Sequence, residues 1–149
     1  MTTVNPYLTF LGNCEAAFNH YKSIFGGDFT YVGRFSDMPP QEGQPPLPEE
    51  MKNLIMHISL PISKETILMG SDTGGEWAPK VTIGNNITIS ISTDSKEDAD
   101  KFFNGLSEGG NITMPIGPTF WGDYFGMCTD KFDINWMVSY NERMPEGKE

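Results

Sequence analysis

The chain repeats one pattern of residues, and this repeat limits the folds it can adopt. An alanine, a pair of glycines and a threonine recur at a spacing of 83 residues (Ala16 and Ala99, Gly26–Gly27 and Gly109–Gly110, Thr30 and Thr113). Further along, residues 57–69 (HISLPISKETILM) match residues 125–137 (FGMCTDKFDINWM) at a spacing of 68. Recurrence at a fixed spacing is typical of duplicated structural units. We therefore expect two modules of one design, residues 5–73 and 84–141, within a single domain 1–149.

The difference between the two spacings predicts an insertion of 15 residues in the first module. It falls in residues 36–53 (SDMPPQEGQPPLPEEMKN), a stretch rich in proline and acidic residues. Such a composition is typical of an exposed loop. The loop fits three roles equally well, as a cover over a cavity, as part of an interface, or as a mobile surface segment.

Each module begins with a strand pattern that leads into a helix pattern. PYLTF (residues 6–10) and NITISIST (residues 86–93) alternate in polarity, and helices are expected at residues 13–25 and 95–108. In the second helix Ser95 and Asp98 form a start that resembles a capping box, and a glycine pair ends each helix. The matching hairpins follow, so each module is a strand, a helix and about three strands. We predict an α+β fold of two tandem βαβββ modules that form a curved mixed sheet, with helices outside and a concave cavity inside.

The alternation along each strand assigns its side chains to the two faces of the sheet. We expect the apolar members to pack under the helices: Leu8, Phe10, Met56, Ile58, Leu60, Ile87, Ile89 and Ile91. The opposite, concave side then carries the more polar members: Tyr7, Thr9, His57, Thr88, Ser90 and Ser92. A polar face of this kind suits a ligand cavity better than dry packing.

The composition excludes several classes of partner. The net charge is −10 and no Lys/Arg cluster offsets it, which argues against nucleic acid. No stretch approaches 18 consecutive apolar residues, so we expect no membrane span. The N-terminal residues lack the basic and apolar regions of a secretory signal. Cys14 and Cys128 form no CxxC pair. We therefore expect free thiols and a cytoplasmic location.

The chain resembles the vicinal oxygen chelate superfamily, the glyoxalase and bleomycin-resistance fold of paired βαβββ modules, and within it the PhnB-like branch. The resemblance covers nearly the whole chain and rests on PYLTF, FGG, MHISL, ILMGSD, GNN, TMP, TFWGDYFGMCTDKF and WMVSY. It implies a small-molecule ligand and a homodimer in which sheets from both chains complete each cavity. Whether the modules are exchanged between the two chains stays open.

The resemblance also shows where metal ligands would lie. Enzymes of this superfamily place four ligands, mostly His and Glu, on the first and last strands of the two modules. The first-strand windows here are residues 6–8 and 86–89, without His, Asp or Glu, and the last-strand positions match Met69 and Met137. A thioether is a poor ligand for hard or borderline divalent metals. We predict no cofactor and no metal, which argues against glyoxalase or extradiol dioxygenase chemistry, since both need a metal as Lewis acid.

PhnB-like relatives often carry the label 3-demethylubiquinone-9 3-methyltransferase. The sequence has no Gly-rich loop after a parallel-sheet strand that would cradle a nucleoside cofactor. We therefore expect no methyltransferase activity.

His57 is the candidate catalytic residue, because imidazole transfers protons near neutral pH and the strand alternation turns it toward the cavity. The alternative is a half-buried histidine that is hydrogen-bonded across the sheet. The candidate ligand pocket consists of Tyr7, Thr9, Met69, Thr88, Ser90, Phe120, Trp121, Trp136 and Met137. Its aromatic and methionine members suit a planar or apolar ligand, and they equally suit a core or an interface.

Other polar residues near the C-terminus have simpler interpretations. Asp130 and Asp133 flank a tight turn, where Asp side chains commonly accept hydrogen bonds from backbone amides. Asp123 is either a solvated loop carboxylate or a group at the cavity mouth. Cys128 has no neighbouring base and is not expected to be a nucleophile.

Three functions remain open. The favoured one is a metal-free small-molecule binding protein whose ligand is apolar or aromatic. The second is an enzyme in which His57 and the hydroxyls of Tyr7, Thr88 and Ser90 carry out acid–base chemistry. The third is a lyase, dioxygenase or glyoxalase-type enzyme with a divalent metal at a displaced site formed by His57 and loop carboxylates.

Overall fold

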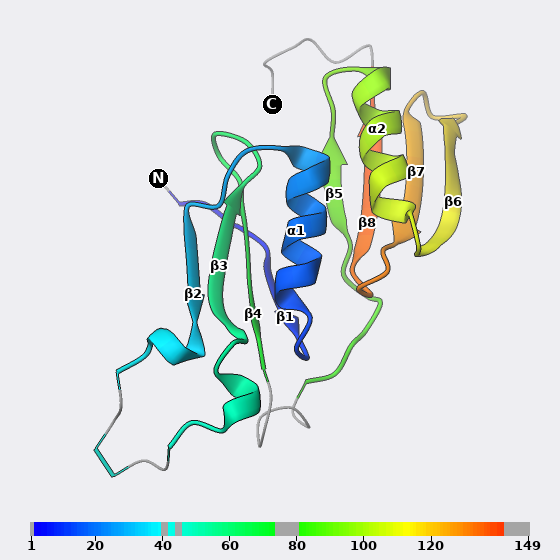
Figure 1. The fold of residues 1–149 in the computed structure, drawn as a ribbon. Helices are drawn as coiled ribbons and strands as arrows, with labels where there is room; N and C mark the ends of the chain where they lie inside the picture. Colours follow the sequence, from blue (N-terminus) through cyan, green and yellow to red (C-terminus); the bar gives the residue numbers. More distant parts are fainter. Residues whose placement is uncertain (1, 40–41, 44–45, 74–80, 142–149) are drawn as a thin grey trace. The chain divides into compact units, whose positions relative to one another are not determined.

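The chain forms two units, each with its own four-stranded sheet. The computed structural model describes residues 2–39, 42–43, 46–73 and 81–141. The chain divides into unit 1, Met1–Thr82, and unit 2, Ile83–Glu149. Each unit runs strand, helix and three strands, and its helix covers one face of its own four-stranded sheet (Figure 1).

Unit 1 contains β1 (Tyr7–Phe10), α1 (Cys14–Phe25), β2 (Tyr31–Arg34), β3 (Ile55–Pro61) and β4 (Ile67–Asp72). Its sheet has the order β1-β4-β3-β2, in which β1 is parallel to β4 and the other pairs are antiparallel. The insertion between β2 and β3 carries two short 3-10 turns, η1 (Phe35–Asp37) and η2 (Glu49–Met51). Most of its described residues are exposed, as expected for a surface loop.

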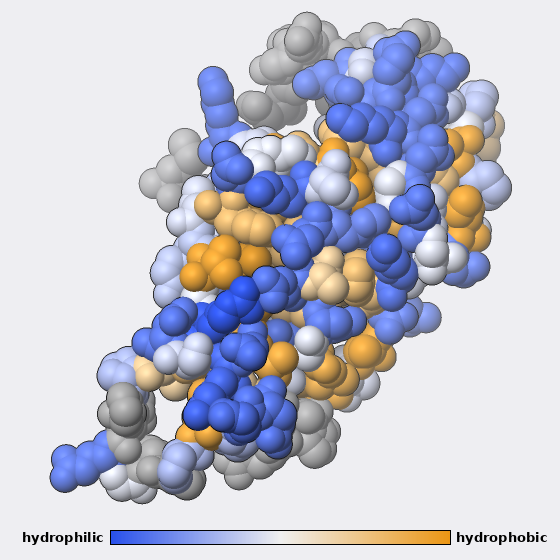
Figure 2. Space-filling view, in the orientation of Figure 1, coloured by the Kyte–Doolittle hydropathy of each residue, from blue (hydrophilic) through white to orange (hydrophobic). Residues whose placement is uncertain are grey.

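Unit 2 contains β5 (Ile89–Ser92), α2 (Lys96–Ser107), β6 (Asn111–Pro118), β7 (Tyr124–Thr129) and β8 (Asn135–Tyr140). Its sheet has the order β5-β8-β7-β6, again with the first strand parallel to its neighbour. The outer surface of α2 is mostly hydrophilic (Figure 2). Its inner side buries Ala99, Phe103 and Leu106.

The strand pairing confirms the two spacings of the repeat. Ser59 pairs with Met69 in unit 1, and the residues 68 positions later, Met127 and Met137, pair in the same way. Tyr7 pairs with Met69, and the residue 83 positions after Tyr7, Ser90, pairs with Met137. The two sheets therefore have equivalent registers.

The helices follow a different spacing, which corrects one predicted match. α1 begins at Cys14 and α2 at Lys96, 82 residues later. The buried counterpart of Ala99 is therefore Ala17, and Ala16 is exposed. The cause is the connection between strand and helix, which is one residue shorter in unit 2 when the strands are aligned by their register.

The cores lie between each helix and its sheet. In unit 1, Ala17, Tyr21 and Ile24 are buried on one face of α1, as predicted. They belong to a core that also contains Phe10, Cys14, Phe18, Ile55, Ile58, Leu60 and Leu68. Gly70 makes room for α1, because a Cβ atom there would lie 2.7 Å from the ring of Phe18.

Five of the eight predicted core positions are not fully buried: Ile87 is exposed, and Leu8, Met56, Ile89 and Ile91 are only half-buried. Met56 is only half-buried, whereas its neighbour Ile55 is fully buried. The reason is an irregularity in the β2–β3 register at Gly33 and Arg34, which breaks the simple alternation along β3. Ile87 is 76% exposed because it precedes β5 and packs under no helix.

The two helices begin with different caps. The Ser95 side chain accepts a hydrogen bond from the Asp98 amide at 3.0 Å, which confirms the predicted start of α2. At α1, the Asn13 side chain makes no capping bond. The buried Asp72 carboxylate replaces it: Oδ1 accepts from the amides of Gly12 and Cys14 at 3.0 and 2.9 Å. Its Oδ2 accepts from the Ile55 amide at 2.9 Å, so Asp72 ties α1, β3 and β4 together.

Both cysteines are buried free thiols, as predicted. Burial raises the pKa of the Cys128 thiol to about 11, and nearby Asp130 adds to this effect. The pKa of the Cys14 thiol is also raised, first by burial and then by Asp72 and Glu15. Neither thiol is therefore an activated nucleophile. Among the described residues, no helix has the length and apolar character needed to cross a membrane.

Candidate functional site

The sheet of unit 1 presents one face away from α1, here called the unit 1 distal face. Directly paired residues share a face of a sheet, and alternate residues along a strand share it too. The face consists of Tyr7, Thr9, Tyr31, Gly33, His57, Ser59, Pro61, Ile67, Met69 and Ser71. The structure thus brings four of the predicted site residues onto one surface (Tyr7, Thr9, His57 and Met69).

His57 is the centre of a hydrogen-bonded chain on this face. Its Nδ1 lies 3.1 Å from the hydroxyl of Tyr7, and its Nε2 lies 2.9 Å from Oγ of Ser59. Tyr7 reaches His57 from β1, across β4, and Ser59 is two residues further along β3. Both ring nitrogens are therefore held by protein groups, so the orientation of the imidazole is fixed.

Two tyrosine rings flank the imidazole. The ring centroids of Tyr7 and Tyr31 lie 5.5 and 5.7 Å from that of His57. Gly33 allows this arrangement, because a Cβ atom there would lie 2.7 Å from the hydroxyl oxygen of Tyr31. Tyr7 and Tyr31 are each about half exposed, at 48% and 49%. No sequence signal points to Tyr31. For Ser59 the available signal is its position two residues after His57, on the same face of the strand.

The matching surface of unit 2, the unit 2 distal face, has a different composition. It consists of Ser90, Ser92, Asn111, Met114, Gly117, Phe125, Met127, Thr129, Asn135, Met137 and Ser139. Met127 pairs with both Met114 and Met137, which gives a row of thioethers across three strands. None of the residues that form this surface is titratable. Of the predicted pocket, this face contains Ser90 and Met137, while half-buried Thr88 lies just before β5.

Trp136 lies on the other side of this sheet, so its predicted place in the pocket is wrong. It is fully buried, and its Nε1 donates a hydrogen bond to Oδ2 of Asp130 at 2.8 Å. Adjacent residues of a strand point to opposite faces, so Trp136 and Met137 cannot line the same surface. Asp130 also accepts from the amides of Phe132 and Ile134, at 2.8 and 3.0 Å, which confirms its predicted role in the turn.

Phe120 and Trp121 lie in the connection between β6 and β7. Phe120 is 98% exposed, and its ring packs edge-to-face on Trp121 with centroids 5.0 Å apart. Trp121 in turn contacts Phe125, at 5.8 Å between centroids. Asp123 is not a free carboxylate, because its oxygens accept from Nε1 of Trp121 at 3.0 Å and Nδ2 of Asn141 at 2.6 Å. The role of this aromatic group as a ligand lining stays a prediction.

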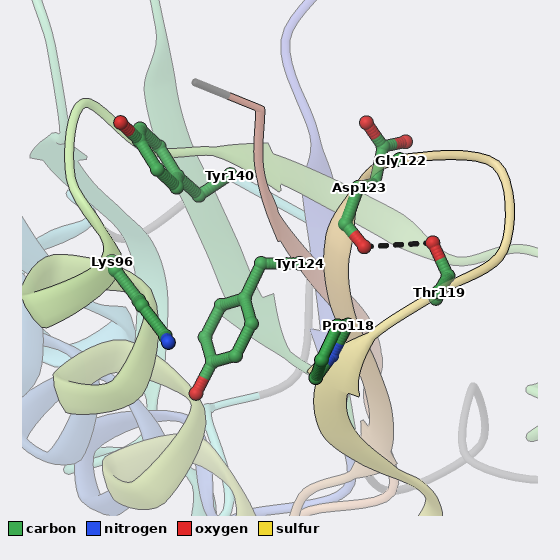
Figure 3. A pocket seen from close by; sticks show the side chains of 7 residues that line it. All are labelled: Lys96, Pro118, Thr119, Gly122, Asp123, Tyr124 and Tyr140. Atoms are coloured by element: carbon green, nitrogen blue, oxygen red, sulfur yellow. Dashed lines mark hydrogen bonds between the residues drawn. The ribbon is translucent and has the colours of Figure 1, made fainter. Parts of the chain in front are cut away.

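A shallow pocket of about 180 Å³ lies at one end of unit 2, near the start of α2 (Figure 3). It is lined by Lys96, Pro118, Thr119, Gly122, Asp123, Tyr124 and Tyr140. Several of its polar groups already make contacts within the unit. The Lys96 ammonium lies 4.8 Å from the centroid of the Tyr124 ring, and the Tyr124 hydroxyl donates to Asp100 at 2.5 Å. This bond raises the pKa of the Tyr124 phenol.

The positions that correspond to the superfamily's metal ligands do not fit a divalent metal. Tyr7 lies beside Met69. The strand register makes Ser90 the equivalent of Tyr7 in unit 2, one residue beyond the window 86–89 expected from the sequence, and Ser90 lies beside Met137. These pairs offer a phenol, a hydroxyl and two thioethers, without the carboxylates and imidazoles that such ions prefer. Over the described ranges of the chain, no three His, Cys, Asp or Glu side chains lie close enough to hold an ion. No chemical step is therefore assigned to a metal.

Comparison with known proteins places this geometry in a family. A sequence model described as the Glyoxalase/Bleomycin resistance protein/Dioxygenase superfamily matches residues 3–138. Protein YjdN of Escherichia coli (strain K12) is 29% identical over 147 residues, covering 95% of this chain and 97% of that protein.

Solved structures with a similar fold support this family assignment. Protein PA1353 from Pseudomonas aeruginosa is 38% identical with a TM-score of 0.78, covering 95% of this chain and 98% of that chain. A putative 3-demethylubiquinone-9 3-methyltransferase, PhnB protein, from Bacillus cereus is 20% identical with a TM-score of 0.72, covering 93% and 99%. The second likeness shows the fold alone. The duplicated βαβββ units and the match over most of the sequence lead to one conclusion: this chain belongs to the glyoxalase/bleomycin resistance protein/dioxygenase superfamily.

Proposed function

We propose that this protein binds a small molecule with an apolar or aromatic part, without a metal ion, on the unit 1 distal face. The observation that carries the proposal is the chain from Tyr7 through His57 to Ser59, flanked by the ring of Tyr31. Binding sites typically combine aromatic surface with a few polar groups held in fixed positions. The residues of this face provide both.

The donor chemistry supports binding over metal-dependent catalysis. The four positions that hold metal ligands in superfamily enzymes carry a phenol, a hydroxyl and two thioethers here. Glyoxalase and dioxygenase chemistry relies on a Lewis acid, which these groups are poorly suited to bind. The methyltransferase name belongs to the Bacillus cereus protein, and no residue of the site described above provides a reason to transfer it.

One rival function has an observation in its favour. A hydrogen-bonded chain of phenol, imidazole and hydroxyl can move a proton from one end to the other, with Tyr7 as its exposed end. An acid–base enzyme without a metal would use this chain, and His57 would then be the relay rather than a free base.

A His57→Ala variant separates binding from catalysis. Thermal shifts of the wild-type protein and the variant are measured against a metabolite library, and each ligand found is then incubated with wild-type protein and followed for turnover. The proposal expects at least one aromatic ligand that stabilises the wild-type protein, with reduced stabilisation of the variant and no turnover. Turnover that is lost in the variant would establish the rival function instead. A library without any stabilising ligand would contradict both.

The shape of the complete site is a further part of the proposal. The resemblance to the superfamily implies a concave cavity and a homodimer in which both chains contribute to each cavity. Light scattering coupled to size-exclusion chromatography tests the dimer, for which a mass of twice 16.6 kDa is expected. A monomer at all concentrations would contradict it.

A further inference from the structure

We infer that the ligand of the unit 1 distal face is an uncharged aromatic compound with a hydroxyl or carbonyl oxygen on its ring, and that Tyr7 is the residue that binds this oxygen. The inference rests on the proposed function and narrows its ligand class. It follows from the hydrogen-bond capacity of the Tyr7–His57–Ser59 chain and from the charges of the surrounding side chains.

The first step concerns the groups that are free to meet a ligand. Both nitrogens of His57 are occupied, by Tyr7 at 3.1 Å and by Ser59 at 2.9 Å. Ser59 is buried, whereas Tyr7 is 48% exposed. The exposed polar end of the chain is therefore the phenolic oxygen of Tyr7, and the imidazole acts on a ligand only through it.

The second step concerns what Tyr7 can bind. A neutral imidazole donates from one nitrogen and accepts at the other. If Nδ1 accepts from the Tyr7 hydroxyl, the phenolic oxygen keeps its lone pairs for a ligand hydroxyl. If Nδ1 carries the proton and donates to Tyr7, the Tyr7 hydroxyl is free to donate to a ligand carbonyl. Ser59 adapts to either state because its hydroxyl both donates and accepts. The chain thus matches an oxygen of either kind.

The third step concerns charge. The strands contribute Tyr, Thr, Gly, His, Ser, Met, Pro and Ile to the described part of this face, and none of these side chains is a fixed cation. Arg34, the basic residue of β2, forms an ion pair with Glu15 of α1, with 2.7 Å between Nη2 and Oε2. A ligand carboxylate or phosphate would have no fixed cation here, and an ionised group without a partner is costly to desolvate. The net charge of −10 adds repulsion for anions.

The fourth step concerns the ring. The two tyrosine rings on either side of His57 are each about half exposed. Exposed aromatic surfaces beside a fixed polar group favour a planar ligand that stacks on the rings while its oxygen reaches the polar group. An uncharged hydroxyaromatic or quinone-like compound meets all of these conditions.

Three probes with the same ring test the inference: 2-naphthol, naphthalene and 2-naphthoate. The chain has two histidines, His20 and His57, so a His57→Gln variant assigns the imidazole C2–H signal of His57 in proton NMR spectra. Titration of the wild-type protein is expected to move this signal, with 2-naphthol binding about 3- to 10-fold more tightly than naphthalene, the gain from one hydrogen bond. Binding of 2-naphthoate is expected to be weaker than that of 2-naphthol.

A Tyr7→Phe variant removes only the phenolic oxygen from a half-exposed ring. It is expected to bind 2-naphthol no better than naphthalene, while its affinity for naphthalene stays unchanged. Tyr124→Phe, which removes a phenolic oxygen from unit 2, is the matched control and is expected to keep the preference. Equal wild-type affinity for 2-naphthol and naphthalene, tighter binding of 2-naphthoate, or a preference that survives in Tyr7→Phe would overturn this inference and leave the proposed function standing. Absence of binding by all three probes would contradict the proposed function itself.

Discussion

The two units share a topology and a strand register, yet their distal faces differ in chemistry. Unit 1 presents an imidazole between two phenols, with hydroxyls beside them. Unit 2 presents a row of three methionines, a phenylalanine and uncharged polar groups. Duplication has therefore preserved the backbone while leaving each surface free to change. This difference is the basis of our proposal that ligand recognition belongs to unit 1, whereas the distal face of unit 2 is a soft apolar surface.

The cores of the two units also differ, in the strand that carries the glycine under the helix. In unit 1, Ile58 on β3 pairs with Gly70 on β4. In unit 2 the order is reversed, since Gly126 on β7 pairs with Val138 on β8. In both units a helix phenylalanine, Phe18 or Phe103, packs against the glycine. Each core thus needs one glycine under its helix, and either strand can supply it.

Removal of a buried carboxylate is expected to have the largest effect on the stability of the fold. Asp72 accepts bonds from three backbone amides in unit 1, whereas Asp130 accepts from two amides and an indole in unit 2. Replacing either by Ala leaves three donors without their acceptor, so we expect each change to lower the free energy of unfolding by about 3 kcal/mol or more. Urea unfolding measures this. Asp94→Ala, an exposed change, is the control, and a loss below about 1 kcal/mol at either buried site would refute the assigned roles.

Substitution of the core glycine of either unit is expected to lower the free energy of unfolding by a somewhat smaller amount. Gly70→Ala would place a Cβ 2.7 Å from the Phe18 ring, and Gly126→Ala would place one 2.8 Å from the Phe103 ring. Overpacking of this kind is expected to cost about 1–3 kcal/mol in the free energy of unfolding. Gly117→Ala has no atom within 4 Å of the new Cβ and should be tolerated. The reversed arrangement would lose its support if all three variants unfolded at the same urea concentration.

The cysteines predict a fall in stability at high pH. Burial raises the pKa of Cys128 from 9.0 to about 11. The unfolded chain therefore releases this proton more readily, and the free energy of unfolding decreases as the pH rises from 9 to 11, by about 2 kcal/mol for this thiol. A Cys128→Ala variant should lose part of this decrease, and Cys14 in unit 1 accounts for a further part. Identical pH profiles of the variant and the wild-type protein would show that Cys128 is not protected.

The ion pair between Arg34 and Glu15 has no counterpart among the residues of unit 2 that the structure describes, and its removal is expected to have the smallest effect on stability. Arg34 binds both oxygens of Glu15, at 3.0 and 2.7 Å, and the carbonyl oxygen of Asn53 at 2.8 Å. The bond from Arg34 lowers the pKa of Glu15, so its contribution is present at neutral pH and is lost as the pH falls below 4.5. Because both side chains are partly exposed, Arg34→Ala should cost less than about 1 kcal/mol in the free energy of unfolding. A larger loss in thermal unfolding would mean that Arg34 holds the insertion in place.

Much of the fold could be predicted because its signals are local. Ser95 marks the start of α2, Gly26 ends α1 with a positive φ of 80°, and Asp130 forms its turn within five residues. The role of Asp72 could not be read from the sequence. Its partners Gly12 and Ile55 are 60 and 17 residues away, and only the folded sheet brings them together.

The site was predictable in part for the same reason. The alternation from His57 to Leu60 predicts the face of the sheet on which His57 lies, but nothing local indicates that Tyr31 of β2 lies beside it. That contact depends on strand pairing and on the space left by Gly33. The aromatic character of Trp136 suggests a pocket residue, but the alternation along β8 turns its side chain into the core because its neighbour Met137 lies on the distal face.

One titration tests the central claim that ligand recognition belongs to unit 1. 2-Naphthol is added to ¹⁵N-labelled protein whose methionine methyl groups carry ¹³C, and backbone and methyl signals are followed together with the His57 imidazole. The account predicts that the signals of Tyr7, Tyr31 and His57 move along one binding curve and that this curve disappears in Tyr7→Phe. Saturable changes confined to Met114, Met127 and Met137, with His57 unmoved, would contradict it.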